Sequence, residues 1–154
     1  MANSRNGEQR SYVSALEEGK IKRAVQMWLN SCDCLPLPKL NYNYHGENIG
    51  LFLVPLQAPY ITRRYILGGY EAQYQFSVDL LLPAGNDDER MTADEELESV
   101  ATWAEQNFSA METEDGSIRM RKLNRDTPAV PLDMLQSGAE IHSINFTLFY
   151  EVNV

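Results

Sequence analysis

Two long stretches of alternating apolar and polar side chains constrain the fold of this chain more than any other feature of its sequence. The first is GGYEAQYQFSVDLLL, residues 68–82, and the second is AEIHSINFTLFYEV, residues 139–152. A period of two is typical of a β-strand that buries one face. Typical strands have about five or six residues, so strands of twice that length need a purpose beyond the core of a small domain.

In both stretches the apolar parity predicts the face that packs on the core. The first stretch carries Tyr70, Ala72, Tyr74, Phe76, Val78 and Leu80 on that face, opposite Glu71, Gln73, Gln75, Ser77 and Asp79. The second carries His142, Ile144, Phe146, Leu148, Tyr150 and Val152 on one face, and a largely polar set on the other. A histidine on the apolar parity is interpreted as a satisfied core or interface residue rather than a general base.

Two segments predict amphipathic helices. In residues 11–31 the apolar positions recur at i, i+3, i+4, i+7 and i+8 from Ile21 onward. A second helix is predicted from Thr92, because Thr92 and Glu95 match a capping box and apolar residues continue at helical spacing to Met111.

The remaining segments predict strands and turns. A hairpin turn is expected at Gly68 and Gly69, since glycine accepts the positive φ that tight turns require. The other expected elements are strands at 39–45 and 49–56 joined by a turn at 46–48, a strand at 60–67, a turn at 83–91, a short basic strand at 117–124, and a loop or edge strand at 126–133.

This order predicts an α+β fold. We expect a mainly antiparallel sheet with a long β-hairpin, and two amphipathic helices packed on one face. The length of 154 residues fits one domain, residues 11–154, after a polar and flexible N-terminus at residues 1–10. The chain lacks an apolar run of the roughly 18 residues that cross a bilayer, and its N-terminus lacks a secretion signal, so no membrane partner is expected.

Charge is unevenly distributed along the chain. The net charge is −9, which argues against a protein that mainly grips nucleic acid. Residues 87–115 hold eleven acids and one base, whereas basic residues cluster at 20–23, 63–64 and 119–125. Separate regions of opposite charge could bring copies of one chain together head to tail, or could steer a partner toward the chain. The alternative is a set of solvated faces that keep the chain soluble.

The sequence contains no recognisable catalytic motif, meaning no set of reactive residues at a spacing typical of an active site. We therefore expect no enzymatic activity and no cofactor. Cys32 and Cys34 alone would supply only half of the ligands of a structural zinc site, which Asp33 and His45 could complete; the favoured alternative is simple thiols at a helix end. The acids of GNDDER, residues 85–90, could bind a cation, but their spacing differs from that of an EF-hand. They are interpreted as a solvated turn.

The order of elements resembles the tail terminator proteins of long-tailed bacteriophages, also described as minor capsid or tail completion proteins. The segments that carry the resemblance are AVQMWL, YILGGYEAQYQFSVDLLL, ADEELESVATWAEQNF and INFTLFYEV, and the resemblance as a whole spans nearly the whole chain, from about residue 11 to residue 153. The resemblance implies a structural virion protein. It would form a ring, commonly of six subunits, that caps the tail tube, ends its elongation and presents a surface to the head connector. It supplies no catalytic residues.

The resemblance and the charge pattern together predict where subunits meet. The polar face and tip of the hairpin would contact a neighbouring copy, with Arg63 and Arg64 opposite acids on the next subunit. The expected interface residues are Arg63, Arg64, Gly68, Gly69, Glu71, Gln73, Gln75, Asp87, Asp88 and Glu89.

The expected partners are other copies of the chain, the tail tube protein and a head completion or connector protein. DNA would pass through an acidic channel without sequence-specific binding. The expected location is the head-proximal end of the tail, after assembly in the cytoplasm of the host bacterium. The alternatives are another phage neck protein, such as a head completion or connector component, and a small metal-dependent or ligand-binding module.

Overall fold

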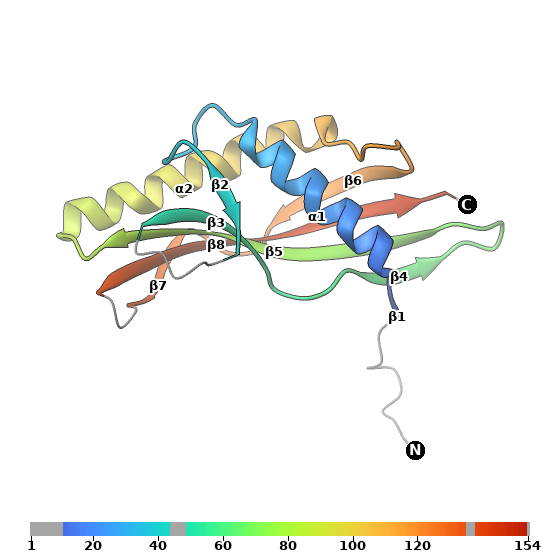
Figure 1. The fold of residues 1–154 in the computed structure, drawn as a ribbon, viewed down its shortest axis with the longest axis horizontal. Helices are drawn as coiled ribbons and strands as arrows, with labels where there is room; N and C mark the ends of the chain where they lie inside the picture. The colour runs from blue at the N-terminus through green and yellow to red at the C-terminus, as the bar shows by residue number, and fades with distance from the viewer. Residues whose placement is uncertain (1–10, 44–48, 135–137, 154) are drawn as a thin grey trace, which may run out of the picture.

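The two alternating segments form adjacent strands in a computed structural model of the chain. Strand β5 (Tyr70–Pro83) pairs antiparallel with β8 (Ala139–Val152) over their full 14 residues, from Tyr70↔Val152 to Pro83↔Ala139. The length of β5 is therefore explained by a long partner inside the same sheet. The strand does not project alone beyond its domain, and the turn that precedes it forms one end of the molecule (Figure 1).

The structure describes residues 11–43, 49–134 and 138–153. The predicted N-terminal flexibility and the predicted turn at 46–48 lie outside these ranges. Besides β5 and β8, the elements are β1 (Ser11–Tyr12), α1 (Ala15–Asn30), β2 (Leu40–Tyr42), β3 (Gly50–Pro55), β4 (Tyr60–Arg64), α2 (Asp87–Asn107), the 3₁₀ helix η2 (Phe108–Ala110), β6 (Ile118–Arg125) and β7 (Val130–Met134).

Within the described residues, one eight-stranded sheet is built around the β5–β8 pair. The outer edge of β5 pairs with β3 along one half and β4 along the other, and the outer edge of β8 pairs with β7 and β6 in the same way. All pairings are antiparallel except β2 with β3. The predicted α+β class with a mainly antiparallel sheet is confirmed.

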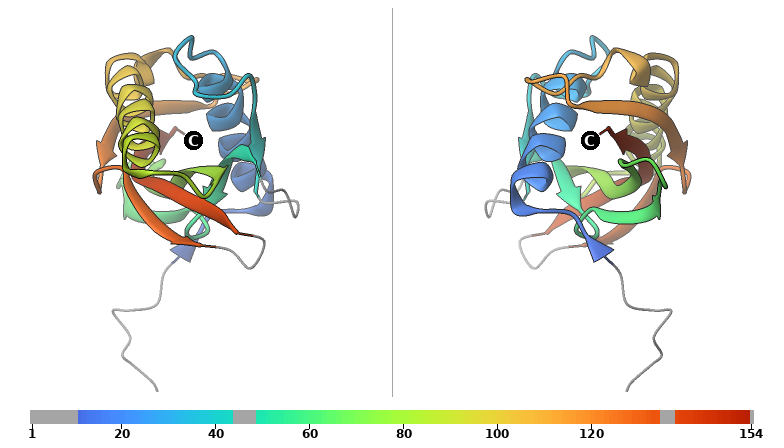
Figure 2. Two further views of the ribbon diagram at one scale, coloured as in Figure 1. Left: turned by 90° about the vertical axis from the view of Figure 1, so that its left-hand side faces the viewer. Right: turned by 90° about the vertical axis from the view of Figure 1, so that its right-hand side faces the viewer.

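The main core lies between the two helices and one face of the sheet (Figures 1 and 2). The aromatic rings of β5 and β8 form its centre: Tyr74 stacks on Phe76 at 5.3 Å between ring centroids, and Phe76 on Phe146 at 5.4 Å. The rings of Trp28 on α1 and Trp103 on α2 are in contact, with their centroids 5.1 Å apart. The even parity of both strands points at this core, as the alternation predicted.

Both helices begin at positions other than those the sequence predicted. Helix α2 starts at Asp87, because Asn86 and Glu89 form a capping box. The Asn86 side chain accepts a hydrogen bond from the Glu89 backbone N–H, and the Glu89 side chain accepts one from the Asn86 backbone N–H. The prediction of a turn through residues 83–91 and a start at Thr92 is therefore wrong. Helix α1 starts after the N-cap Ser14, and residues 11–12 are a short strand instead of helix.

Hydrogen bonds to the buried carboxylate of Glu17 connect the N-terminus of α1 to the sheet. Glu17 is 8% exposed and accepts hydrogen bonds from the hydroxyls of Tyr70 on β5 and Tyr150 on β8, the latter at 2.8 Å. Burial and the Glu17 hydrogen bond raise the pKa of Tyr70 to about 12. A charge in the core is tolerated only when it is hydrogen-bonded, so these contacts fix the position of α1 on the sheet.

Neither helix among the described residues is both long enough and apolar enough to cross a membrane.

Candidate subunit interface

The hairpin tip is a turn of five residues between β4 and β5. The Tyr65 backbone N–H donates to the Gly69 carbonyl at 3.1 Å, and the Gly68 N–H donates to the Tyr65 carbonyl at 3.2 Å. Gly68 and Gly69 both have positive φ, of 101° and 84°. A Cβ on Gly69 would lie 2.6 Å from the Val152 carbonyl oxygen, so this turn geometry requires glycine, as the sequence predicted.

Three residues that the sequence assigned to a strand, Tyr65, Ile66 and Leu67, lie in this turn. Strand β4 ends at Arg64, and the side chains of Ile66 and Leu67 are 102% and 97% exposed. Single exposed apolar residues are common on protein surfaces, but two adjacent ones at a turn form a small exposed apolar patch. Apolar residues placed directly before a Gly-Gly pair are the sequence signal that could have identified an exposed apolar tip.

The base of the hairpin is held by a charged network on the sheet face away from the helices. Glu71 on β5 and Glu151 on β8 are direct cross-strand neighbours, and like charges in such a position are destabilising. The Tyr65 hydroxyl donates to Glu71 at 2.5 Å and lies 3.1 Å from Glu151. Arg119 and Arg121 of β6 contact the Glu151 carboxylate at 3.3 and 3.1 Å. The hydrogen bond to Glu71 above all, with burial and the contact to Glu151, raises the pKa of Tyr65 to about 12.

The other predicted residues of the polar face are half-buried within the sheet. Gln73 accepts from the Tyr60 hydroxyl of β4 at 2.7 Å, and the backbone carbonyl of Gln75 accepts from the Leu56 N–H at 3.0 Å. These residues hold β5 against its neighbours, whereas Arg63 and Arg64 on β4 are exposed. The solvent-facing part of the predicted surface is therefore the hairpin end.

The predicted acids form the first turn of α2. Asp87, Asp88 and Glu89 are exposed, and the helix dipole favours negative charge at this position. Glu89 is committed to the capping box, and Asp87 lies 3.5 Å from Arg90. Because Asp87 and Asp88 lie outside the capping bonds, they are the acids best placed to meet another molecule.

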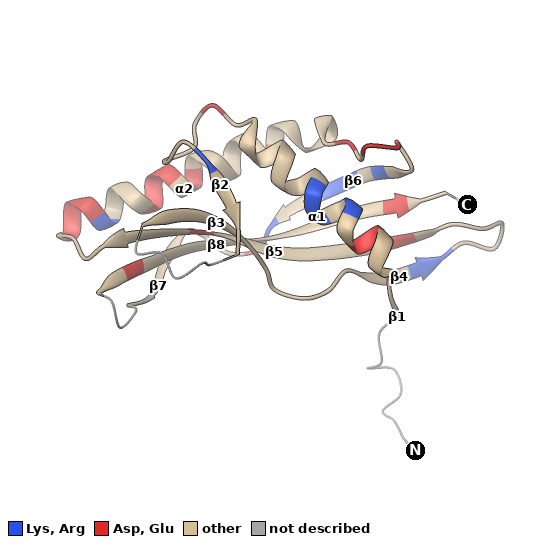
Figure 3. Ribbon diagram, in the orientation of Figure 1, with Lys and Arg blue, Asp and Glu red and all other residues tan. Residues whose placement is uncertain are grey.

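The basic and acidic groups occupy opposite ends of the molecule. Arg63 and Arg64 lie beside the start of β5, and Asp87 follows its end (Figure 3). A strand of 14 residues spans roughly 40 Å. The two groups cannot meet within one chain, so a contact between them would be a contact between copies.

Several of the other charged groups identified in the sequence are already paired inside the chain. Close intrachain pairing lowers the charge that they offer to a partner, whereas the Asp87 carboxylate, 3.5 Å from Arg90 and 94% exposed, is only loosely paired. Arg63 and Arg64 instead lie over the rings of Tyr65 and Tyr70, at 5.6 and 5.8 Å from the ring centroids. The paired groups are Lys20 with Asp115, Lys22 with Glu18, and Arg125 with Glu98 and Glu105.

A polar cluster that the sequence did not predict lies beside the acidic end. Glu140 of β8 is 6% exposed and accepts from the guanidinium of Arg90 at 2.8 and 2.9 Å. His142 is buried, with Nδ1 2.9 Å from Asp94 and Nε2 3.4 Å from Glu140. The interpretation of His142 as a satisfied buried residue is confirmed. The four residues come from α2 and β8, so only their pairing in space reveals the cluster.

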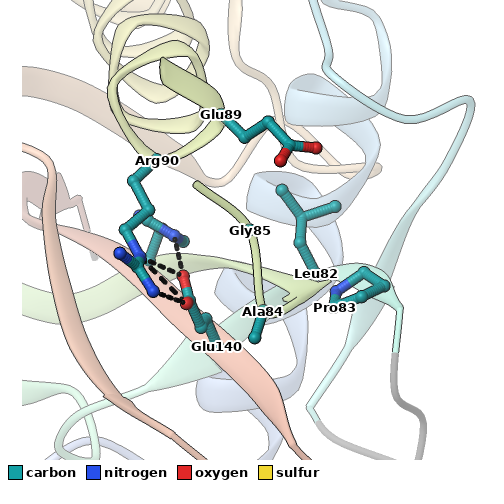
Figure 4. A pocket seen from close by; sticks show the side chains of 8 residues that line it. Leu82, Pro83, Ala84, Gly85, Glu89, Arg90 and Glu140 are labelled. Atoms are coloured by element: carbon teal, nitrogen blue, oxygen red, sulfur yellow. Dashed lines mark hydrogen bonds and ion pairs between the residues drawn. The ribbon is translucent and has the colours of Figure 1, made fainter. Parts of the chain in front are cut away.

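A hollow of about 160 Å³ opens next to this cluster, at the junction of β5 and α2 (Figure 4). Its polar lining includes Glu89, Arg90, Glu140 and His142, and its apolar lining is Leu82, Pro83 and Ala84. Pro83 and Ala84 are exposed. The acidic end therefore combines exposed negative charge with a shallow recess that has one apolar wall and one charged wall.

Acid pH is expected to destabilise the fold through Glu140. The hydrogen bond from Arg90 holds the pKa of Glu140 below its usual range. A carboxyl with a lowered folded-state pKa adds stability above its unfolded pKa, about 4.3, and loses it as the pH falls through the folded value. Thermal unfolding measured between roughly pH 6 and pH 2 should show this loss.

The variant Glu140→Gln should flatten this acid branch, and Glu95→Gln, which changes an exposed carboxyl on α2, is the matched control. Equal acid dependence in wild type and Glu140→Gln would show that Glu140 is not the group responsible.

The two cysteines lie side by side after α1. Their sulfur atoms are 2.7 Å apart, and with the Asp33 carboxylate they form a group whose ligand atoms lie within 4.8 Å of one another. Cys32 is buried, and this burial is the main cause that raises its pKa to about 12, which disfavours the thiolate that metals bind. The possible ligand His45 lies outside the described residues.

Comparisons with known proteins give no functional assignment. No family model and no curated protein matches this chain. A solved structure aligns over 90% of this chain and 94% of its own length, with 17% sequence identity and a TM-score of 0.40. A similarity at this level carries no argument, and the fold class rests on the strands and helices themselves.

Proposed function

We propose that this chain is a phage tail terminator: a structural protein that assembles into a ring on the head-proximal end of a tail tube, ends its elongation and offers a surface for head joining. The observation that carries the proposal is the separation of exposed Arg63 and Arg64 from Asp87 and Asp88 along the full length of β5. Complementary patches at opposite ends of one subunit favour a head-to-tail contact, which closes into a ring when the rotation allows.

The electrostatics also suit a ring that surrounds DNA. A chain of net charge −9 repels phosphate, so DNA could pass through such a ring without adhering to its wall. In this proposal the chain has no catalytic role. Its partners are further copies of itself, the tail tube protein and a head completion or connector protein, and its place is the virion.

The first experiment measures mass in solution across a concentration series, with negative-stain imaging of any large species. A ring of six 17.5 kDa chains has a mass of about 105 kDa. We expect closed rings either in free solution or on addition of purified tail tubes, and rings should appear at one tube end only. A chain that stays monomeric with tubes present, and leaves their ends bare, would contradict the proposal.

A further inference from the structure

We propose that the apolar tip of the β4–β5 hairpin is the anchor of the subunit contact, and that it docks in the recess at the β5–α2 junction of a second copy. This inference rests on the proposed self-assembly and goes beyond its charge pairing. The tip presents Ile66 and Leu67, both fully exposed, next to Arg63 and Arg64. A few well-packed residues at the centre of an interface, surrounded by contacts that exclude water, typically supply most of the binding energy.

The tip is preorganised for docking. Its turn is closed by the backbone hydrogen bonds between Tyr65 and the two glycines, and the Tyr65 hydroxyl is tied to Glu71. The guanidinium of Arg63 lies over the Tyr65 ring. A segment that is already ordered loses little conformational entropy when it binds. Two aliphatic side chains held in this way are therefore an efficient contact surface.

The opposite end of the molecule offers matching chemistry. The recess of about 160 Å³ has an apolar wall of Leu82, Pro83 and Ala84, and it can receive an aliphatic side chain. Asp87 and Asp88 lie on the first turn of α2, directly after this wall in the chain. An apolar tip with two arginines beside it thus meets a recess that has one apolar wall and two aspartates beside it, its other wall being the paired Arg90 and Glu140 with His142.

The occupant that we infer for the recess is a second copy, because the charges beside the tip and beside the recess are complementary and the two lie at opposite ends of β5, too far apart to meet within one chain. An apolar hairpin tip with flanking arginines also fits an anionic membrane. However, the net charge of −9 makes such a surface repel the rest of the chain. The experiment below tests the membrane as a competing occupant.

The test is a pair of double variants measured by sedimentation velocity, alone and with tail tubes. Ile66→Ser with Leu67→Ser removes the anchor, and Leu16→Ser with Met27→Ser removes two exposed apolar side chains of α1 as the matched control. We expect the tip variant to weaken self-association at least about 30-fold. The control should associate like the wild type. Unchanged association of the tip variant would overturn the inference.

A photoreactive benzoylphenylalanine in place of Leu67 locates the contact directly. We expect crosslinks between copies to map to residues 82–91. Crosslinks to α1, or wild-type binding to vesicles of anionic lipid that the tip variant loses, would overturn the inference. Rings that persist in the tip variant would leave the proposed function standing without this anchor, whereas a wild-type chain that never assembles on itself or on tubes would overturn both.

Discussion

Reversing both arginines of the hairpin, Arg63→Glu with Arg64→Glu, is expected to abolish ring assembly while the fold is retained. Two exposed arginines that faced Asp87 and Asp88 of the next copy would become acids facing acids, and like charges at an interface cost several kcal/mol. Self-association should weaken by at least about 100-fold. Sedimentation velocity and imaging on tail tubes provide the measurement, and thermal unfolding checks that the subunit is folded.

A charge swap makes this prediction specific. Adding Asp87→Arg and Asp88→Arg to the reversed hairpin should restore assembly, because the attractive pairing is rebuilt with opposite signs. The control is Arg23→Glu with Lys39→Glu, which changes the net charge by the same amount at exposed positions outside the hairpin and the first turn of α2. If the control abolishes assembly as fully as the hairpin reversal, net charge rather than this contact governs association.

The largest loss of stability outside the apolar core is expected for Glu17→Ala. The change removes the acceptor of two tyrosine hydroxyls and leaves the hydroxyl of Tyr150, which is fully buried, without its partner. Loss of a charged acceptor together with an unsatisfied buried hydroxyl should cost about 3 to 5 kcal/mol. For a domain of this size the melting temperature would fall by roughly 10 °C. Thermal and urea unfolding would measure both quantities.

Two conservative tyrosine variants separate the hydrogen bond from packing. Tyr150→Phe removes a hydroxyl that donates to Glu17 and should destabilise the fold by about 1 to 3 kcal/mol. Tyr74→Phe removes an equally buried hydroxyl that has no hydrogen-bond partner among the described residues, so it should be neutral or slightly stabilising. Equal effects of the two changes would contradict the assigned role of Glu17.

Local signals in the sequence located most elements. The strict alternation of β5 and β8 identified both strands and their buried faces, because a period of two is fixed by the geometry of the extended chain. Gly68 and Gly69 identified the hairpin, since only glycine suits this turn. The start of α2 was misplaced because two capping signals compete. Asn86 with Glu89 forms the cap, whereas the similar pattern at Thr92 lies inside the helix.

The candidate interface was predictable as a set of residues but not as a geometry. The sequence showed that Arg63 and Arg64 are separated from the acids of residues 87–89, and it suggested that copies could meet. The sequence could not show that Gln73 and Gln75 are half-buried and bonded to neighbouring segments, since their burial depends on the strands that flank β5 on both sides. The fully exposed state of Ile66 and Leu67 was missed because the strand β4 ends before them.

The sequence by itself determined the long strands, the presence of both helices and the buried faces of β5 and β8, because periodicity and turn chemistry act over a few neighbouring residues. The tertiary structure alone decided which distant residues meet. Glu140 pairs with Arg90, 50 positions away in the chain, and Glu17 accepts a hydrogen bond from Tyr150, 133 positions away. Likewise, the arginines of the hairpin and the aspartates of α2 lie at opposite ends of one paired strand. These relations depend on the order and register of strands in the sheet, which are set by packing of the whole core rather than by any local pattern.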